Sequence, residues 1–80
     1  MKYYVYILEC QDDTLYTGIA TDVKRRFKEH LEGKGAKYTK SRGVKKIIFQ
    51  EEHKDRSSAL KREIEIKKMN RRAKLALLKA

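Results

Sequence analysis

The first twenty residues contain two short apolar runs separated by a polar turn. The first run, residues 3–10, has aromatic and β-branched side chains at both alternating sets of positions, which is typical of a central strand covered on both faces. Gln11, Asp12 and Asp13 are turn-forming residues, and residues 14–20 form the second run. The pattern predicts a β-hairpin.

A helical period follows the hairpin, in the stretch TDVKRRFKEHLEG. Asp22 or Thr21 is placed to cap its first turn, and a glycine ends it. Its apolar residues recur at helical spacing and are expected on one buried face: Val23, Phe27 and Leu31.

The remainder of the chain predicts a loop at residues 33–43, a third strand at residues 44–51, and two helices. The longer helix is opened by Asp55 and runs to about Met69, and the shorter one covers residues 71–79. The element order is therefore β-β-α-β-α-α. This order predicts one α+β domain over residues 1–80, with helices flanking a three-stranded, mostly antiparallel sheet.

The charge is strongly positive and uneven: 21 lysines and arginines oppose 11 acidic residues, for a net charge of +10. Residues 1–20 hold only one of these cations and three of the acids. A basic surface concentrated in one part of a chain is typical of a protein that binds a polyanion, with nucleic acid as the favoured partner. A lysine-rich surface that serves solubility is the alternative.

Two observations indicate where the protein acts. Cys10 is the only cysteine, so no internal disulfide forms. No apolar run approaches the ~20 residues of a membrane-spanning helix. We therefore expect a cytoplasmic protein without membrane association.

The predicted hairpin brings two tyrosines together. A three-residue loop would pair Tyr6 with Gly18 and Leu8 with Tyr16, which makes the two tyrosines diagonal neighbours on one face. Gly18 leaves space beside Tyr6 for a backbone or a ligand. The alternative is that both tyrosines lie at the edge of the core with hydroxyl groups in water.

The first helix carries Arg26 and His30 four residues apart, so they lie on one side. Each directly precedes a residue of the predicted apolar stripe, which places them at the border between core and solvent, where a groove would form. For Arg26, an ordinary surface cation is the alternative.

The second helix places Glu63 within its apolar arc, which is formed by Ala59, Leu60, Ile64, Ile66 and Met69. A carboxylate on a packed face is costly unless it is paired, hydrogen-bonded or bound to a metal ion. A Glu63–Lys67 pair one turn apart is the simplest alternative, although such pairs contribute only about 0.3–0.5 kcal/mol. Asn70 is expected to cap the last helix.

The segment between Gly33 and Gly43 alternates cations with glycine and one tyrosine, a combination that suits a phosphodiester chain. The sequence contains no Cys/His cluster with zinc-ligand spacing and no acidic pair typical of a two-metal nuclease. The residues expected to contact nucleic acid include one cation of the second helix: Lys34, Lys37, Tyr38, Lys40, Arg42 and Lys67.

These motifs, in this order and spacing, resemble those of the GIY-YIG nuclease superfamily, and most closely its short single-domain bacterial branch. Tyr4-Val5-Tyr6 corresponds to the Gly-Ile-Tyr motif, and Tyr16-Thr17-Gly18 to Tyr-Ile-Gly. Arg26 stands at the family's arginine spacing, His30 matches a histidine present in part of the superfamily, and ALKREIEIKK matches the helix with the metal-binding glutamate, here Glu63. Tyrosine at position 4 and threonine at position 17 depart from the pattern.

The resemblance implies an endonuclease that hydrolyses phosphodiester bonds with one Mg²⁺ or Mn²⁺ ion held by Glu63. Tyr16 would accept a proton from the attacking water, and Arg26 would stabilise the phosphate charge. Tyr6 would position the water or the phosphate. His30 would be a second phosphate contact or a proton acceptor.

The expected partner is nucleic acid, with structured or damaged DNA in repair or recombination as the favoured substrate, and without a small-molecule cofactor. The protein would be a monomer or a weak dimer. Two other classes stay open: a non-catalytic DNA- or RNA-binding module that uses the same basic surface, and a protein-interaction domain whose charge is incidental.

Overall fold

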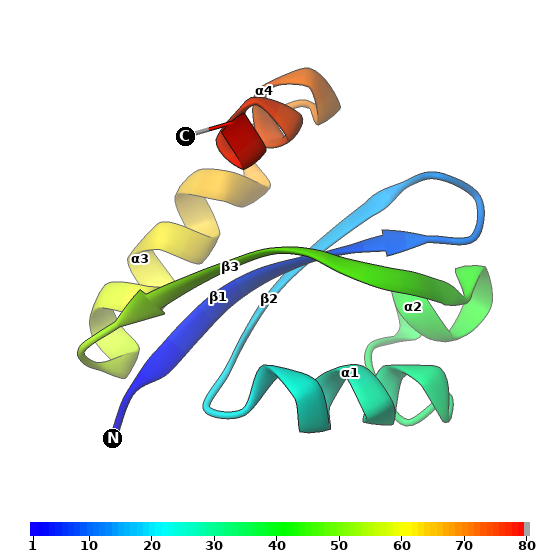
Figure 1. Cartoon of the computed structure of the whole chain (residues 1–80), viewed down its shortest axis with the longest axis horizontal. Helices are drawn as coiled ribbons and strands as arrows, with labels where there is room; N and C mark the ends of the chain where they lie inside the picture. Colours follow the sequence, from blue (N-terminus) through cyan, green and yellow to red (C-terminus); the bar gives the residue numbers. More distant parts are fainter. Residues whose placement is uncertain (80) are drawn as a thin grey trace.

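The central strand of the protein is β1 (Tyr3–Cys10), which pairs antiparallel with β2 (Leu15–Ala20) on one side and β3 (Val44–His53) on the other. The structure is a computed structural model that describes residues 1–79. Both faces of β1 are covered, which explains why its sequence is apolar at successive positions. Its central place in the twisted sheet is visible in Figure 1.

The hairpin has the predicted register: Tyr6 pairs with Gly18, and Leu8 with Tyr16. Its loop is closed by the Cys10 amide, which donates to the Thr14 carbonyl at 2.8 Å. Asp13 takes a left-handed conformation with φ 66°, as the last residue of a three-residue hairpin loop commonly does.

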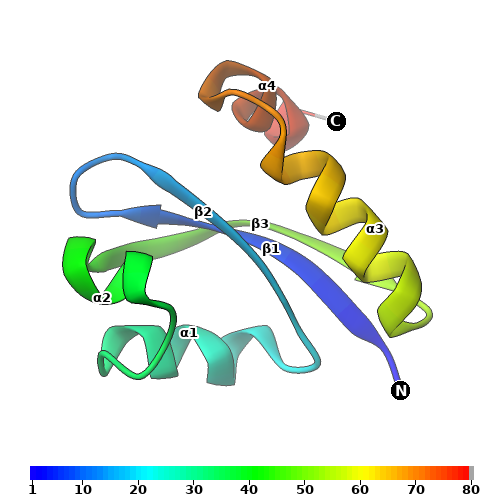
Figure 2. The ribbon, with the colours of Figure 1, turned by 180° about the vertical axis from the view of Figure 1, so that it is seen from behind.

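Helices cover the two faces of the sheet in pairs. Two of them lie on one face and the other two on the opposite face, and the views from front and back agree (Figures 1 and 2). The pair on the first face is α1 (Val23–Leu31) and α2 (Lys37–Arg42), and the pair on the second is α3 (Arg56–Lys67) and α4 (Arg71–Ala76), followed by a 3₁₀ turn (Leu77–Lys79). The predicted α+β class and element order are confirmed, with α2 as an addition.

Three helices begin at the predicted capping residues. Asp22, Asp55 and Asn70 each accept a hydrogen bond from the backbone N–H three residues further on, at 3.0, 2.8 and 2.8 Å. Each bond satisfies one of the amides that a first helical turn leaves without an intrahelical partner.

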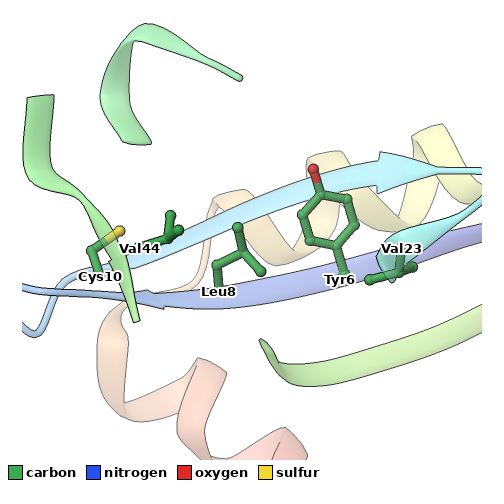
Figure 3. Close-up of a cluster of buried hydrophobic side chains, with 5 residues drawn as sticks. All are labelled: Tyr6, Leu8, Cys10, Val23 and Val44. Carbon is green, nitrogen blue, oxygen red and sulfur yellow. The ribbon is translucent and has the colours of Figure 1, made fainter. Parts of the chain in front are cut away.

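The core has two parts, one on each face of β1. Figure 3 shows the part that lies on the face of α1 and α2: Tyr6, Leu8, Cys10, Val23 and Val44. The other part joins the sheet to α3: Val5, Ile7, Ala59 and Ile66. Because successive residues of β1 enter different parts, this strand couples the two layers of helices.

Two residues predicted to be buried are exposed. Leu31 is 57 % exposed, because the inward position of the last turn of α1 belongs to His30. Ile64 is 54 % exposed, because α3 buries a narrow seam marked by Ala59 and Ile66, seven residues or two turns apart. The apolar arc inferred from the sequence was too wide.

The segment expected to be a loop contains the helix α2. Its turn is held by Thr39, which is 1 % exposed, and it ends at Gly43, whose φ is 73°. The sequence KYTKSR has no apolar period, so the helix depends on tertiary contacts rather than on an amphipathic stripe. β3 also extends two residues beyond its prediction, to His53. Within residues 1–79, no helix combines the length and hydrophobicity that a membrane crossing requires.

Candidate active site

Tyr6 is a buried residue with a polar hydroxyl on the face of the sheet that α1 and α2 cover. It is 1 % exposed, and its ring lies against Gly18 in the neighbouring strand β2 (Figure 3 shows the ring). A Cβ atom on Gly18 would lie 2.6 Å from the Tyr6 hydroxyl oxygen and 3.2 Å from the ring of Tyr16. The space that the sequence predicted beside Gly18 is therefore filled by the two tyrosine rings, whose centroids are 6.5 Å apart.

The Tyr6 hydroxyl lies 3.0 Å from Nε2 of His30, and Nδ1 of the same ring lies 2.7 Å from the hydroxyl of Thr39. The Thr39 hydroxyl donates its single proton to the carbonyl of Ala36 at 2.9 Å. It must therefore accept from His30, so we assign the proton of the neutral ring to Nδ1. Nε2 is left as an acceptor for the Tyr6 O–H.

Burial keeps both members of this pair uncharged. Desolvation, with the nearby hydroxyl of Tyr16, raises the pKa of Tyr6 to about 12, although the guanidinium of Arg26 acts in the opposite direction. Desolvation, with the charge of Arg26, lowers the pKa of His30 below its ordinary value. At neutral pH, Tyr6 is thus a phenol that donates to a neutral imidazole.

Gly35 completes the enclosure of His30. A Cβ atom at this position would lie 2.1 Å from Nδ1 and 2.7 Å from Cε1 of His30. Neither Gly35 nor Thr39 was predicted from the sequence to be part of the site. The glycine was a signal that something approaches this backbone closely, whereas nothing around Thr39 marked it as a partner of His30.

A row of aromatic rings leads from His30 to the surface. The ring centroid of Tyr16 lies 5.3 Å from that of His30 and 5.9 Å from that of Tyr38. The Arg42 guanidinium carbon lies 4.3 Å from the centroid of Tyr38, in a cation–π contact, and the same side chain pairs with Asp12 at 2.6 Å. The structure therefore joins Tyr38 and Arg42, two of the predicted nucleic-acid contacts, to the tyrosine cluster.

Arg26 and Glu63 both act electrostatically on Tyr6, from helices on opposite faces of the sheet. Arg26 in α1 pairs with Glu29 at 3.0 Å and lies close enough to Tyr6 to oppose the rise in its pKa. Glu63 belongs to α3, on the other face of the sheet, yet its carboxylate also contributes to raising the pKa of Tyr6, after the larger effects of burial and Tyr16. Its side chain is only 15 % exposed and pairs with Lys67 at 3.3 Å.

The other predicted nucleic-acid contacts are less closely tied to the cluster. Three of them are exposed and make no ion pair within residues 1–79: Lys34, Lys37 and Lys40. Lys67 is half-exposed and engaged with Glu63, so the predicted one-turn ion pair is present. Their contact with nucleic acid stays a prediction.

Residues 2–76 match the model of the GIY-YIG catalytic domain, which is nearly the whole chain. The chain belongs to the GIY-YIG family. This is a nuclease family, and its members typically use divalent metal ions. In the GIY-YIG fold described above, the two name-giving tyrosine motifs lie on the paired strands β1 and β2, which brings Tyr6 and Tyr16 together.

Relatives of this GIY-YIG protein carry the name UPF0213 protein. One from Streptococcus sanguinis is 50 % identical, with 98 % of this chain and 90 % of the relative covered. One from Cupriavidus necator is 54 % identical, with 92 % and 80 % covered. The solution NMR structure of the UPF0213 protein BH0048 from Bacillus halodurans is 46 % identical, covers 99 % of this chain and 84 % of its own, and superposes with a TM-score of 0.62.

The donor set of this GIY-YIG site fits a hard cation held mainly by water and substrate. Within residues 1–79, no three His, Cys, Asp or Glu side chains gather closely enough to hold an ion by themselves. Glu63 is a largely buried carboxylate near Tyr6, with Lys67 as its ion-pair partner. Mg²⁺ commonly binds through one or two carboxylates, with waters and substrate phosphates as the other ligands.

Proposed function

We propose that this protein is a divalent-metal-dependent endonuclease that hydrolyses phosphodiester bonds in DNA. The observation that carries the proposal is that Tyr6 and Tyr16 lie together on paired strands, while the Arg26 guanidinium and the Glu63 carboxylate both act electrostatically on the Tyr6 hydroxyl. Hydrophobic packing does not require a guanidinium, a carboxylate and two phenols close to one another, whereas functional sites commonly combine such groups. Metal-assisted phosphodiester hydrolysis needs a cation-binding carboxylate, a proton acceptor and a positive charge near the phosphate.

The two tyrosines have different roles in this proposal. Tyr6 is buried, stays protonated and donates a hydrogen bond to His30. We therefore assign it the positioning of neighbouring groups in the site, without direct contact with the body of the DNA substrate. Tyr16 is only partly buried, and its ring stands between His30 and Tyr38 at the accessible end of the cluster. Tyr16 is thus the phenol that a substrate can reach, and we assign it the proton from the attacking water.

Arg26 and Glu63 supply the opposite charges that the reaction requires. The Arg26 guanidinium is held by Glu29 at 3.0 Å and would stabilise both a Tyr16 phenolate and the phosphate oxygens. Glu63 would hold Mg²⁺ or Mn²⁺. When bound, such an ion polarises the phosphate and stabilises the leaving oxygen.

His30 has the second of the two roles that the sequence left open. With 2 % exposure and both ring nitrogens occupied by Tyr6 and Thr39, the ring has no free edge for a phosphate. Its Nε2 accepts the hydrogen bond of the Tyr6 hydroxyl, so we describe it as a positioning residue that fixes this hydroxyl.

Structured or damaged DNA in repair or recombination is the substrate class that we propose. The exposed lysines of the 33–43 segment and the Arg42–Tyr38 pair provide positive charges and an aromatic ring for stacking. Such groups bind the DNA backbone and stack on bases without sequence-specific contacts to base edges. A protein with this surface recognises shape and charge, which suits branched or distorted DNA.

The test is cleavage of supercoiled plasmid and branched DNA by purified protein with Mg²⁺ or Mn²⁺. Tyr16→Phe and Glu63→Gln should each lower the cleavage rate by about 100-fold or more, because a proton acceptor and an ion ligand are lost. Their affinity for DNA in EDTA should stay within about twofold of wild type, because neither change removes a cation.

Matched controls come from the same elements. Tyr3→Phe alters a tyrosine on the opposite face of β1, and Glu65→Gln alters an exposed glutamate of α3. Both variants should cleave at the wild-type rate. Folded wild-type protein that binds DNA but cuts none of these substrates with either ion would refute the nuclease proposal and leave a binding module.

A further inference from the structure

A second concave site lies between the tip of the hairpin and the start of α4. The cavity has a volume of about 490 Å³. It is lined by residues of both segments: Asp13, Thr14, Leu15, Met69, Arg71 and Lys74. None of these residues belongs to the cluster around Tyr6.

The lining combines apolar and cationic surface. Leu15 and Met69 pack against the core on the α3 face and present apolar walls. Arg71 is anchored because its guanidinium donates to the backbone carbonyl of Asp13. The Asp13 carboxylate pairs with Lys45 at 3.5 Å, so its ion-pair partner lies outside the cavity lining.

Lys74 is a half-buried cation without a counter-charge. Within residues 1–79 it makes neither an ion pair nor a side-chain hydrogen bond. Burial lowers its pKa, and the like charge of Lys67 lowers it further. A partly desolvated ammonium group next to another cation is unfavourable unless an anion joins it.

The cavity adjoins the candidate active site across the edge strand β2. Leu15 lines the cavity, and the next residue, Tyr16, points to the opposite face and into the aromatic row, one strand residue or ~3.3 Å further along. Lys67 connects the two places by charge, because it pairs with Glu63 and acts on Lys74. A nucleic-acid strand that is bound at the candidate active site and continues across the edge of β2 would therefore pass over this cavity.

We propose that the cavity binds one nucleotide of the substrate strand that flanks the cleaved position. Arg71 and Lys74 would bind its phosphate, and its sugar and base would lie against Leu15 and Met69. A bare phosphate uses only the cations, whereas a nucleotide also covers the apolar walls, which is why we choose the nucleotide. This inference rests on the proposed function, since it assigns a neighbouring subsite to the same substrate.

The first test measures how salt affects the affinity for a labelled branched oligonucleotide in EDTA, where no cleavage occurs. The double variant Arg71→Gln/Lys74→Gln should weaken binding by about tenfold and reduce the slope of log affinity against log salt by about one, because one phosphate contact contributes close to one. The matched control is Lys54→Gln/Arg56→Gln, which removes the same two residue types from exposed positions in the turn before α3 and at its first residue. The control should change the slope by less than half as much. Equal slopes for the two double variants would overturn the inference.

The second test distinguishes a nucleotide subsite from a simple phosphate site. Methyl signals of Leu15 and Met69 are followed by NMR during titration with a dinucleotide and, separately, with inorganic phosphate. Shifts with the dinucleotide that exceed those with phosphate, and that disappear in Arg71→Gln/Lys74→Gln, support the subsite. Methyl shifts that are the same with both probes contradict it.

The outcomes separate this inference from the nuclease proposal. If wild type cuts nothing but the Arg71/Lys74 variant loses salt slope selectively, the subsite stands and the proposed activity fails. If Tyr16→Phe abolishes cleavage while the Arg71/Lys74 variant binds like its control, the activity stands and the subsite fails.

Discussion

At the scale of single residues, the site depends on a histidine that the fold holds neutral. His30 accepts a hydrogen bond from the Tyr6 hydroxyl at Nε2 and donates one to Thr39 from Nδ1, and its ring is packed against the backbone of Gly35. A protonated ring would have two N–H groups and would therefore lose its acceptor for the Tyr6 hydroxyl. Protonation of His30 thus conflicts with both its burial and its hydrogen bonds.

This conflict predicts a pH-dependent stability. The folded-state pKa of His30 lies below the unfolded value of about 6.5, so the unfolded chain binds more protons in the interval between the two values. The free energy of unfolding should be at its full value above about pH 6.5 and should decrease as the pH falls below it. Urea denaturation at several pH values between about 5 and about 8 measures this change.

The matched variant for this prediction is His30→Gln, which can retain a hydrogen bond but does not titrate. The other histidine, His53, is present in both wild type and the variant, so a difference between the two proteins is attributed to His30. The variant should lose part of the decrease seen in wild type below about pH 6.5. If its stability falls with pH as steeply as that of wild type, His30 is not the responsible group.

At the scale of elements, the parts governed by local chemistry could be predicted from the sequence. The hairpin register followed from loop length and strand period, and it placed Tyr6 and Tyr16 on one face before the structure did. The capping residues Asp22, Asp55 and Asn70 were also found from short-range rules.

The parts that depend on tertiary contacts could not be predicted in this way. A helical wheel shows which residues share a side, but the width of the buried seam is set by the neighbouring sheet, and so Leu31 and Ile64 were misplaced. α2 contains the buried Thr39, which is hydrogen-bonded to His30, nine residues earlier in the chain. No sequence pattern within α2 predicts this hydrogen bond. Of the site itself, the candidate reacting groups were visible in the sequence, whereas the groups that hold His30 were not.

The seam of α3 gives a prediction with a matched pair of isoleucines. Ile66 is fully buried, whereas Ile64, two residues earlier, is 54 % exposed. Ile66→Ala should lower the free energy of unfolding by about 2–5 kcal/mol, because it removes buried methyl groups and leaves a cavity. Ile64→Ala should change it by less than about 1 kcal/mol. Urea denaturation of both variants measures these free energies of unfolding. Similar losses of stability at the two positions would mean that α3 buries the wider arc inferred from the sequence.

At the scale of the whole molecule, one charge distribution has two opposite consequences. The net charge of +10 is carried by only 80 residues, and most ion pairs between lysine or arginine and carboxylates in residues 1–79 lie at the surface. Such pairs contribute little, so repulsion among the excess cations opposes the compact state. The same excess would attract a polyanion over long distances.

Salt should therefore stabilise the fold and weaken nucleic-acid binding over the same range. Raising NaCl from about 20 mM to about 200 mM shortens the Debye length from roughly 20 Å to below 10 Å, which screens the repulsion and should raise the thermal midpoint by a few degrees. Affinity for DNA, measured by fluorescence anisotropy in the same buffers, should fall by more than tenfold, because bound counterions are no longer released into dilute salt. The two measurements use one sample series and have opposite expected signs, so partial unfolding cannot account for the loss of binding. A thermal midpoint that falls with salt would instead mean that the surface ion pairs outweigh the repulsion, which their exposure in this structure argues against.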